Sequence, residues 1–90
     1  MILIVEDTAH IRKLIKAVLK DENIEIEEAV TGEEAIDKIQ QGKKYELILM
    51  DIMLPKIDGI STTQKIREIT ETPVIFLTAL SDEKNQIIAY

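Results

Sequence analysis

Three short segments of this sequence are apolar at every position, and they limit the possible folds more than any other feature. They span residues 2–5, 47–50 and 74–77, and the first of them is rich in β-branched side chains. Strands that are apolar on both faces are typical of parallel sheets that helices cover on both sides. The chain is therefore expected to build its core around a parallel sheet.

Segments with helical periodicity separate these apolar runs. Residues 9–20 carry apolar side chains at helical spacing: Ile11, Leu14, Ile15, Val18 and Leu19. Most of Ile11, Leu14 and Ile15 are expected in the core. Thr31 precedes Glu34 by three residues, which is a capping box that opens a second helix, and Gly42 is expected to end that helix. A weaker pattern predicts a third helix over about residues 60–69.

The remaining segments complete an alternating order. Isoleucines and glutamates alternate over residues 24–27, which predicts a half-exposed edge strand. Ser81 is suited to cap a last helix that continues to Tyr90. Strand and helix thus alternate along the whole chain, which indicates an α/β fold with a flavodoxin-like, doubly wound parallel sheet. In such sheets the functional site lies beyond the carboxyl ends of the strands.

The composition excludes several classes of protein. Ninety residues suffice for one domain, and the net charge of −6 argues against direct binding of nucleic acid. The absence of cysteine excludes disulfide scaffolds and thiolate zinc sites. No apolar run approaches the roughly 20 residues of a membrane span. The acidic pair Glu6 and Asp7 is unlike a signal peptide, so no membrane association and a cytoplasmic location are expected.

Residues that can carry chemistry, each with a polar side chain except Ala79, follow three of the predicted strands where each strand ends. Glu6 and Asp7 follow the first, Asp51 follows the second apolar run, and Thr78 and Ala79 follow the third. Parallel strands bring these residues to one edge of the sheet, where three carboxylates repel one another unless a cation is present. Oxygen ligands on such an anionic site favour Mg²⁺. The alternative is that these carboxylates only cap helices or face water.

Four motifs at these strand ends give the sequence a family resemblance. They are Ile-Val-Glu-Asp at 4–7, Leu-Met-Asp-Ile-Met-Leu-Pro at 49–55, Asp-Gly at 58–59 and Phe-Leu-Thr-Ala at 76–79. In this order and spacing they resemble the receiver domain of bacterial two-component response regulators. The resemblance covers the whole chain, residues 1–90, and it implies a phosphorylation-controlled signalling module.

The resemblance implies a role for each matching residue. Asp51 would be the phosphoacceptor, whose carboxylate attacks a phosphohistidine on a sensor histidine kinase. Asp7 would bind Mg²⁺ directly and Glu6 through water, while Asp51 and the backbone carbonyl of Met53 would complete the protein ligands. Thr78 would be the hydroxyl that turns toward the phosphoryl group.

Further residues are expected to shape the site. By resemblance, the small Ala79 leaves access to it, and Pro55 and Gly59 form the loop after Asp51. Met53 and Leu80 would flank the path of hydrolytic water, and both are apolar, so self-dephosphorylation is expected to be slow.

Basic residues near the first helix receive no role in the site. His10 is expected to be a surface residue. Arg12 and Lys13 are expected on the solvated face of the helix.

The resemblance also implies parts that this sequence does not match. A complete receiver has a fifth strand with a lysine and a fifth helix after residue 90, so the chain is interpreted as a receiver truncated at its C-terminus. An output domain, most often DNA-binding, would lie outside this chain. The run 74–77 would then be an unpaired sheet edge that favours self-association or pairing with a missing segment.

Three alternatives belong to other functional classes. A phosphatase of the haloacid-dehalogenase type requires a second aspartate at position 53, which is methionine here. A dinucleotide-binding module requires a glycine-rich turn after the first strand, and residues 6–11 contain no glycine. An inactive structural receiver fragment, or a piece of a domain-swapped assembly, stays open as the third alternative.

Overall fold

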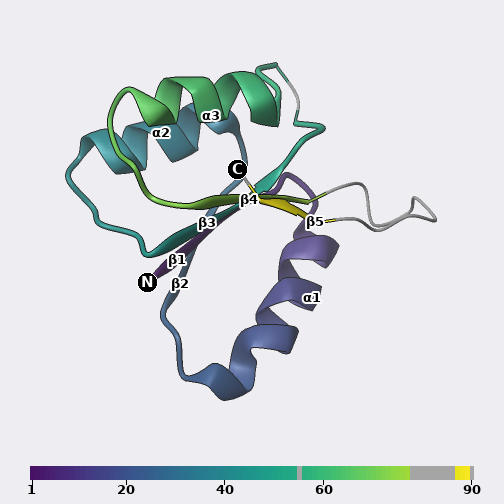
Figure 1. Ribbon diagram of the computed structural model, residues 1–90. Helices are drawn as coiled ribbons and strands as arrows, with labels where there is room; N and C mark the ends of the chain where they lie inside the picture. The colour runs from purple at the N-terminus through teal and green to yellow at the C-terminus, as the bar shows by residue number, and fades with distance from the viewer. Residues whose placement is uncertain (55, 78–86, 90) are drawn as a thin grey trace.

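A single sheet organises the computed structural model, which describes residues 1–54, 56–77 and 87–89. The strands lie in the order β2-β1-β3-β4-β5 (Figure 1). The first four are parallel and the last is antiparallel to its neighbour: β1 (Ile2–Val5), β2 (Ile26–Ala29), β3 (Leu47–Asp51), β4 (Val74–Leu77) and β5 (Ile87–Ala89). The predicted parallel sheet is therefore confirmed.

The register of the central strands determines which residues meet at the carboxyl edge. Val5 pairs with Met50, and Asp51 pairs with Leu77. Because β1 and β3 are parallel neighbours, the residues that follow Val5 come to lie beside Asp51. The edge strand predicted over residues 24–27 is found two residues later, at Ile26–Ala29.

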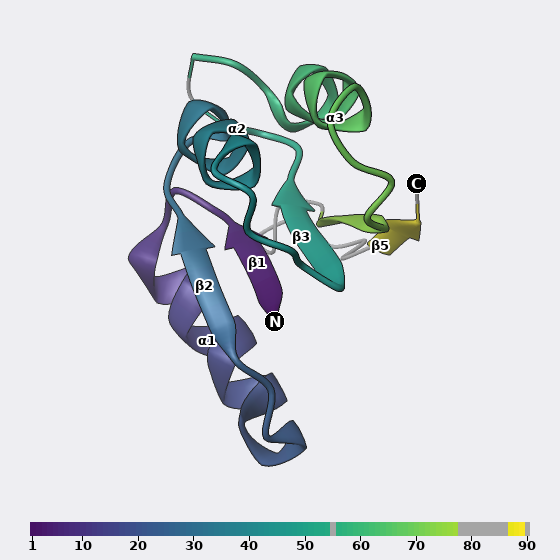
Figure 2. The same cartoon turned by 90° about the vertical axis from the view of Figure 1, so that its left-hand side faces the viewer.

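Helices cover the two faces of the sheet unequally. Helix α1 (Ala9–Leu19) lies on one face and continues into the short 3₁₀ helix η1 (Lys20–Glu22). Helices α2 (Gly32–Gln40) and α3 (Gly59–Arg67) lie together on the other face (Figures 1 and 2). Within the described residues, every helix is too short or too polar to cross a lipid bilayer.

Side-chain caps begin α2 and α3. The Oγ1 atom of Thr31 accepts a hydrogen bond from the Glu34 N–H at 3.1 Å, and Glu34 Oε1 accepts one from the Val30 N–H at 2.8 Å. The bond to Thr31 confirms the predicted cap of α2, whereas Glu34 bonds the N–H one residue before the N-cap and not that of Thr31 itself. Asp58 caps α3 in the same way, because its Oδ1 accepts a hydrogen bond from the Ser61 N–H at 2.7 Å.

The core lies mainly between the sheet and the pair α2 and α3. Its central side chains have no exposed surface: Leu3, Val5, Ala35, Ile48, Met50 and Ile66. Two buried hydroxyls of α3 donate to backbone oxygens one turn earlier, Thr62 to Asp58 and Thr63 to Gly59. These bonds satisfy polar groups that would otherwise be costly to bury.

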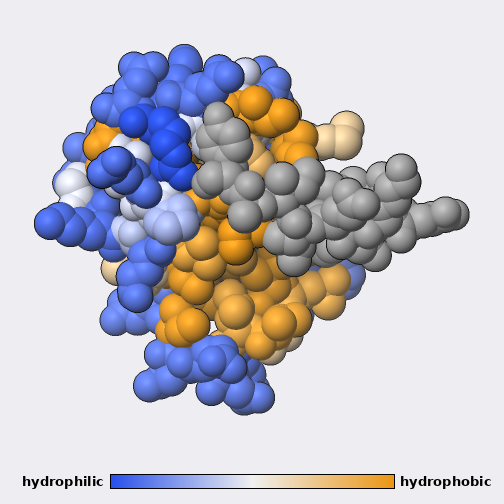
Figure 3. All heavy atoms as spheres, in the orientation of Figure 1, coloured by the Kyte–Doolittle hydropathy of each residue, from blue (hydrophilic) through white to orange (hydrophobic). Residues whose placement is uncertain are grey.

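Helix α1 is less buried than its periodicity predicts. Val18 is 79% exposed and Leu14 46%. Ile11 and Ile15 are only half-buried, so the expectation that most of Ile11, Leu14 and Ile15 lie in the core is wrong. Among the helices of the described residues, α1 alone lies on its face of the sheet, so no other described helix packs against the outer side of its stripe. Figure 3 shows apolar side chains gathered there, over α1 and the sheet. They line a groove: Leu14, Ile15, Val18, Leu19, Leu49, Ile75 and Leu77.

The C-terminal segment differs from the sequence prediction. The helix expected from Ser81 to Tyr90 is wrong at residues 87–89, which form β5, and its other residues lie outside the described ones. Strand β5 pairs with β4, so the unpaired edge expected at Val74–Leu77 is also wrong. The exposed backbone groups of β4 gain hydrogen-bond partners in this way. Self-association stays a prediction.

Candidate functional site

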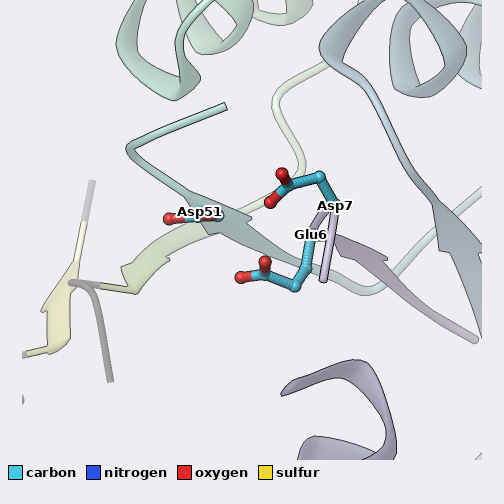
Figure 4. Close-up of side chains that lie close together, drawn as sticks. All are labelled: Glu6, Asp7 and Asp51. Atoms are coloured by element: carbon cyan, nitrogen blue, oxygen red, sulfur yellow. The ribbon is translucent and has the colours of Figure 1, made fainter. Parts of the chain in front are cut away.

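Three carboxylates meet at the carboxyl edge of the sheet. Glu6 and Asp7 directly follow β1, and Asp51 is the last residue of β3. One oxygen of each lies within 4.8 Å of the others, and Figure 4 shows the three side chains converging. Glu6 and Asp51 are buried, with 3% and 7% of their surface exposed, whereas Asp7 is exposed. The structure thus brings together the three acidic residues that the strand ends predicted.

Backbone hydrogen bonds hold Glu6 in place. Its N–H donates to the Ala29 oxygen of β2 at 3.0 Å, and its side-chain Oε2 accepts a bond from the Thr8 N–H at 3.0 Å. Its own carbonyl oxygen accepts a bond from Arg12 Nη1 at 2.8 Å. Hydrogen bonds therefore fix both the N–H and the carbonyl group of Glu6, in the loop that connects β1 to α1.

The electrostatics of the cluster favour a bound cation. Burial raises the pKa of Glu6 to about 7, the hydrogen bond from the Thr8 amide opposes this rise, and the nearby charge of Asp51 adds to it. A carboxylate with so high a pKa is poorly solvated and crowded by like charge. A hard divalent ion would relieve both costs, and three carboxylate oxygens are donors that Mg²⁺ accepts. The residues present therefore fit such an ion.

The loop after Asp51 turns tightly against it. The Met53 N–H donates to Asp51 Oδ1 at 3.1 Å, and the Gly59 N–H donates to the Ile52 oxygen at 2.9 Å. A Cβ atom on Gly59 would lie 2.1 Å from the backbone oxygen of Asp51. Gly59 therefore has no room for a side chain where α3 meets the end of β3.

An open depression lies beside the carboxylates. Its lining combines acidic and apolar side chains: Asp7, Ile52, Met53, Leu54, Asp58 and Ile60. The side chain of Met53 is 71% exposed and that of Ile60 48%. The sequence offered no reason to place Ile60 there, because a residue at a helix start can face either way.

Other predicted site residues are placed differently. Pro55, Thr78, Ala79 and Leu80 lie outside the described residues. His10 is exposed, as predicted.

Arg12 is the functional candidate that the sequence prediction missed. Its side chain is only 16% exposed and reaches Glu6 and Glu28, so the prediction of a solvated position is wrong. Lys13 is exposed, as expected. A basic residue in a helical pattern gives no sign of whether it turns back toward the preceding strand.

The sheet order and the acidic cluster together define a receiver-type signalling domain. The family model of the response regulator receiver domain matches residues 2–90. The chain belongs to this family, which confirms the resemblance carried by the four motifs.

Curated relatives are transcriptional regulatory proteins. ResD of Bacillus subtilis is 46% identical over 86 residues, and SrrA of Staphylococcus aureus is 45% identical over 86 residues. Each match covers 96% of this chain and 35% of the relative. The chain thus spans about a third of the length of these proteins.

Solved receiver structures share the fold. The response regulator TrrA of Thermotoga maritima, in complex with Mg²⁺–BeF, is 40% identical with a TM-score of 0.79, and the match covers 89% of this chain and 70% of TrrA. The receiver domain of a sensor histidine kinase from Pseudomonas aeruginosa, with magnesium coordinated in its active-site cleft, is 33% identical with a TM-score of 0.80. That match covers 91% of this chain and 69% of the domain.

Proposed function

We propose that this chain is the phosphoacceptor module of a two-component phosphorelay and takes a phosphoryl group onto Asp51 from a sensor histidine kinase. One observation carries the proposal: Asp51 ends a central strand within 4.8 Å of the carboxylates of Glu6 and Asp7. An open depression that Asp7 and Met53 line lies next to this cluster. Family membership supports the same chemistry.

The reaction is a substitution at phosphorus. A carboxylate oxygen of Asp51 attacks the phosphorus of a phosphohistidine, the P–N bond breaks, and an acyl phosphate forms on Asp51. The leaving imidazole takes up a proton from water. The Met53 N–H orients the nucleophile through its bond to Asp51 Oδ1. By family resemblance, the hydroxyl of Thr78 would turn toward the transferred group.

Mg²⁺ is the proposed cofactor. Asp7 and Asp51 would hold it directly, Glu6 through water, and Met53 through its backbone carbonyl. When bound, the ion would offset the negative charge that gathers on the phosphoryl oxygens. The acidic cluster supports this assignment, as do the magnesium-containing receiver structures similar to this chain.

The partners follow from the same proposal. A sensor histidine kinase would donate the phosphoryl group, and an output domain would read the state of Asp51. ResD and SrrA are transcriptional regulators, which supports transcription as the controlled process. The net charge of −6 supports a receiver that does not itself bind nucleic acid, and a cytoplasmic location is proposed with it.

The experiment is intact mass spectrometry after incubation with acetyl phosphate, with and without Mg²⁺. Asp51→Asn is the test variant. Asp58→Asn is the matched control, because it removes a carboxylate from the same depression and asparagine still caps α3. The expected result is one added phosphoryl group that requires Mg²⁺ and Asp51 and persists in the control. No addition to the folded protein would favour the alternative of an inactive structural fragment.

Slow self-dephosphorylation is a second part of the proposal. Met53 is 71% exposed next to Asp51, and its apolar side chain cannot orient a water molecule. Decay of the phosphorylated mass with time measures the rate. The pair Met53→Asn with Leu80→Glu is expected to accelerate decay, and an unchanged rate would contradict this part alone.

A further inference from the structure

The side chain of Arg12 joins three elements next to the acidic cluster. We propose that Arg12 is a positioning residue: it fixes the peptide between Glu6 and Asp7 and so holds both carboxylates in place for a divalent cation. The inference rests on the proposed function, since it concerns the same site, and it assigns a role to a residue that does not touch the cation itself.

Two directed hydrogen bonds define the position of the guanidinium. Nη1 donates to the carbonyl oxygen of Glu6 at 2.8 Å, and Nε donates to Glu28 Oε1 at 2.8 Å. Only 16% of the Arg12 side chain is exposed. One planar group therefore connects the end of β1, the first turn of α1 and the edge strand β2.

The bond to Glu6 completes a fixed frame around the site. The Glu6 N–H already donates to Ala29 of β2, and Arg12 holds the carbonyl on the other side of the same residue. The Arg12 backbone N–H also donates to the oxygen of the N-cap residue Thr8 at 3.1 Å, so Arg12 lies in the first hydrogen-bonded turn of α1. The carbonyl of Glu6 belongs to the peptide that leads into Asp7, so fixing it restricts the direction of the Asp7 side chain.

Glu28 holds Arg12 in turn. It lies on β2 opposite Ile4, and its second oxygen accepts a bond from Lys16 Nζ at 2.9 Å. The two basic residues thus share one carboxylate, but only Arg12 reaches the acidic loop. Lysine at position 12 would keep the charge and lose the planar fork that makes both bonds at once.

The sign of the charge effect separates positioning from simple electrostatics. A positive charge near the cluster repels a cation, so removing it should tighten Mg²⁺ binding if charge were its only effect. Loss of a group that orients metal ligands weakens binding instead, typically by about tenfold or more. Lys16→Met is the matched control. It also removes one positive charge and one hydrogen-bond donor to Glu28, but it leaves the bond from Arg12 to the Glu6 carbonyl intact.

The test is calorimetric titration of the folded variants with MgCl₂. Arg12→Met is expected to bind Mg²⁺ about tenfold more weakly than the wild type. Arg12→Lys should fall between the two, and Lys16→Met should bind as the wild type does or slightly more tightly. If Arg12→Met does not fold, Glu28→Gln takes its place and is expected to weaken binding by about threefold, because Arg12 loses its ionic anchor.

A second measurement needs no metal. Amide hydrogen exchange in EDTA reports the bond from the Thr8 N–H to Glu6 Oε2, and the Gly59 N–H on the neighbouring loop is the reference. Faster exchange at Thr8 in Arg12→Met, with Gly59 unchanged, supports the positioning role. If the wild type bound no Mg²⁺, the proposal that the acidic cluster binds this cation would be wrong. The exchange rate of the Thr8 N–H would still test whether Arg12 positions Glu6. Wild-type exchange at Thr8 in Arg12→Met would overturn the role.

Discussion

The backbone oxygen of Asp51 lies 2.1 Å from the position that a Cβ atom on Gly59 would take. An alanine there must push α3 or the end of β3 aside, because the contact is backbone and cannot rotate away. Gly59→Ala is therefore expected to lower the free energy of unfolding by about 2 kcal/mol. It should also slow phosphorylation of Asp51, since the displaced strand end carries the nucleophile. Thermal melting and the acetyl phosphate assay measure the two effects.

Gly42→Ala is the control for this substitution. Gly42 has a φ of 91°, and no atom lies within 4 Å of the position that an added Cβ would take. Alanine there should lower the free energy of unfolding through backbone strain alone, by about 1 kcal/mol. Because Gly42 lies after α2, away from the acidic cluster, phosphorylation should be unaffected. A Gly59→Ala protein that melts and reacts as the wild type does would contradict the close approach.

The stability of the metal-free protein should depend on pH through Glu6. Its pKa is about 7 in the folded protein, against the usual 4.5. Between these values the folded state binds more protons than the unfolded state, so the free energy of unfolding falls as pH rises from about 4.5 to about 7. The amide side chain of the Glu6→Gln variant does not ionise in this range, so the variant should be more stable than the wild type at pH 8, by about 3 kcal/mol.

Urea unfolding in EDTA across this pH range tests the prediction. Glu25→Gln is the control, because it removes a carboxylate from an exposed position of the same chain. The control should keep the wild-type slope, and Glu6→Gln should flatten it. If the free energy of unfolding varied with pH in the same way for the wild type and Glu6→Gln, ionisation of the buried Glu6 would not destabilise the protein.

The sequence predicted the placement of the three carboxylates better than it predicted the burial of helix α1. Glu6, Asp7 and Asp51 could be placed together because the carboxyl ends of parallel strands share an edge, whatever the loops do. The buried runs at residues 2–5 and 74–77 gave strands with the observed bounds. These features depend on local pattern and topology alone.

The errors concern partners that are distant in sequence. Periodicity showed that α1 has an apolar stripe, but it could not show what covers that stripe, and Val18 is exposed. Residues 87–89 suit a helix or a strand, and the pairing with β4 decides between them. Arg12 looked like a surface residue because its partners are distant in sequence: Glu6 lies in the loop after β1, and Glu28 lies on β2.

Addition of Mg²⁺ should stabilise the protein through the acidic cluster. A ligand that binds only the folded state at 100 times its dissociation constant adds about 2.7 kcal/mol to the free energy of unfolding. For a domain of this size the melting temperature should rise on the order of 10 °C. Asp7→Asn should lose most of this rise, whereas Asp58→Asn should keep it. An equal rise in Asp7→Asn would place the cation elsewhere.

Tyr45 and Glu27 form a polar contact at the opposite end of the sheet from Asp51. The Tyr45 hydroxyl donates to Glu27 Oε1 at 2.6 Å, and the tyrosine is only 7% exposed. Burial, followed by the charge-assisted bond to Glu27, raises the pKa of Tyr45 above its usual range. Tyr45→Phe leaves the ring in place and removes only this bond, so the melting temperature should fall by about 5 °C.

Lys43→Met is the comparison for Tyr45→Phe. Lys43 Nζ bonds the second oxygen of Glu27 at 2.8 Å, but the lysine side chain is 39% exposed, and ion pairs at such positions contribute little. The melting temperature of Lys43→Met should therefore fall by less than that of Tyr45→Phe. Because both residues lie away from the acidic cluster, each variant should accept a phosphoryl group at the wild-type rate. A slower reaction in Tyr45→Phe would mean that the two ends of the sheet are coupled.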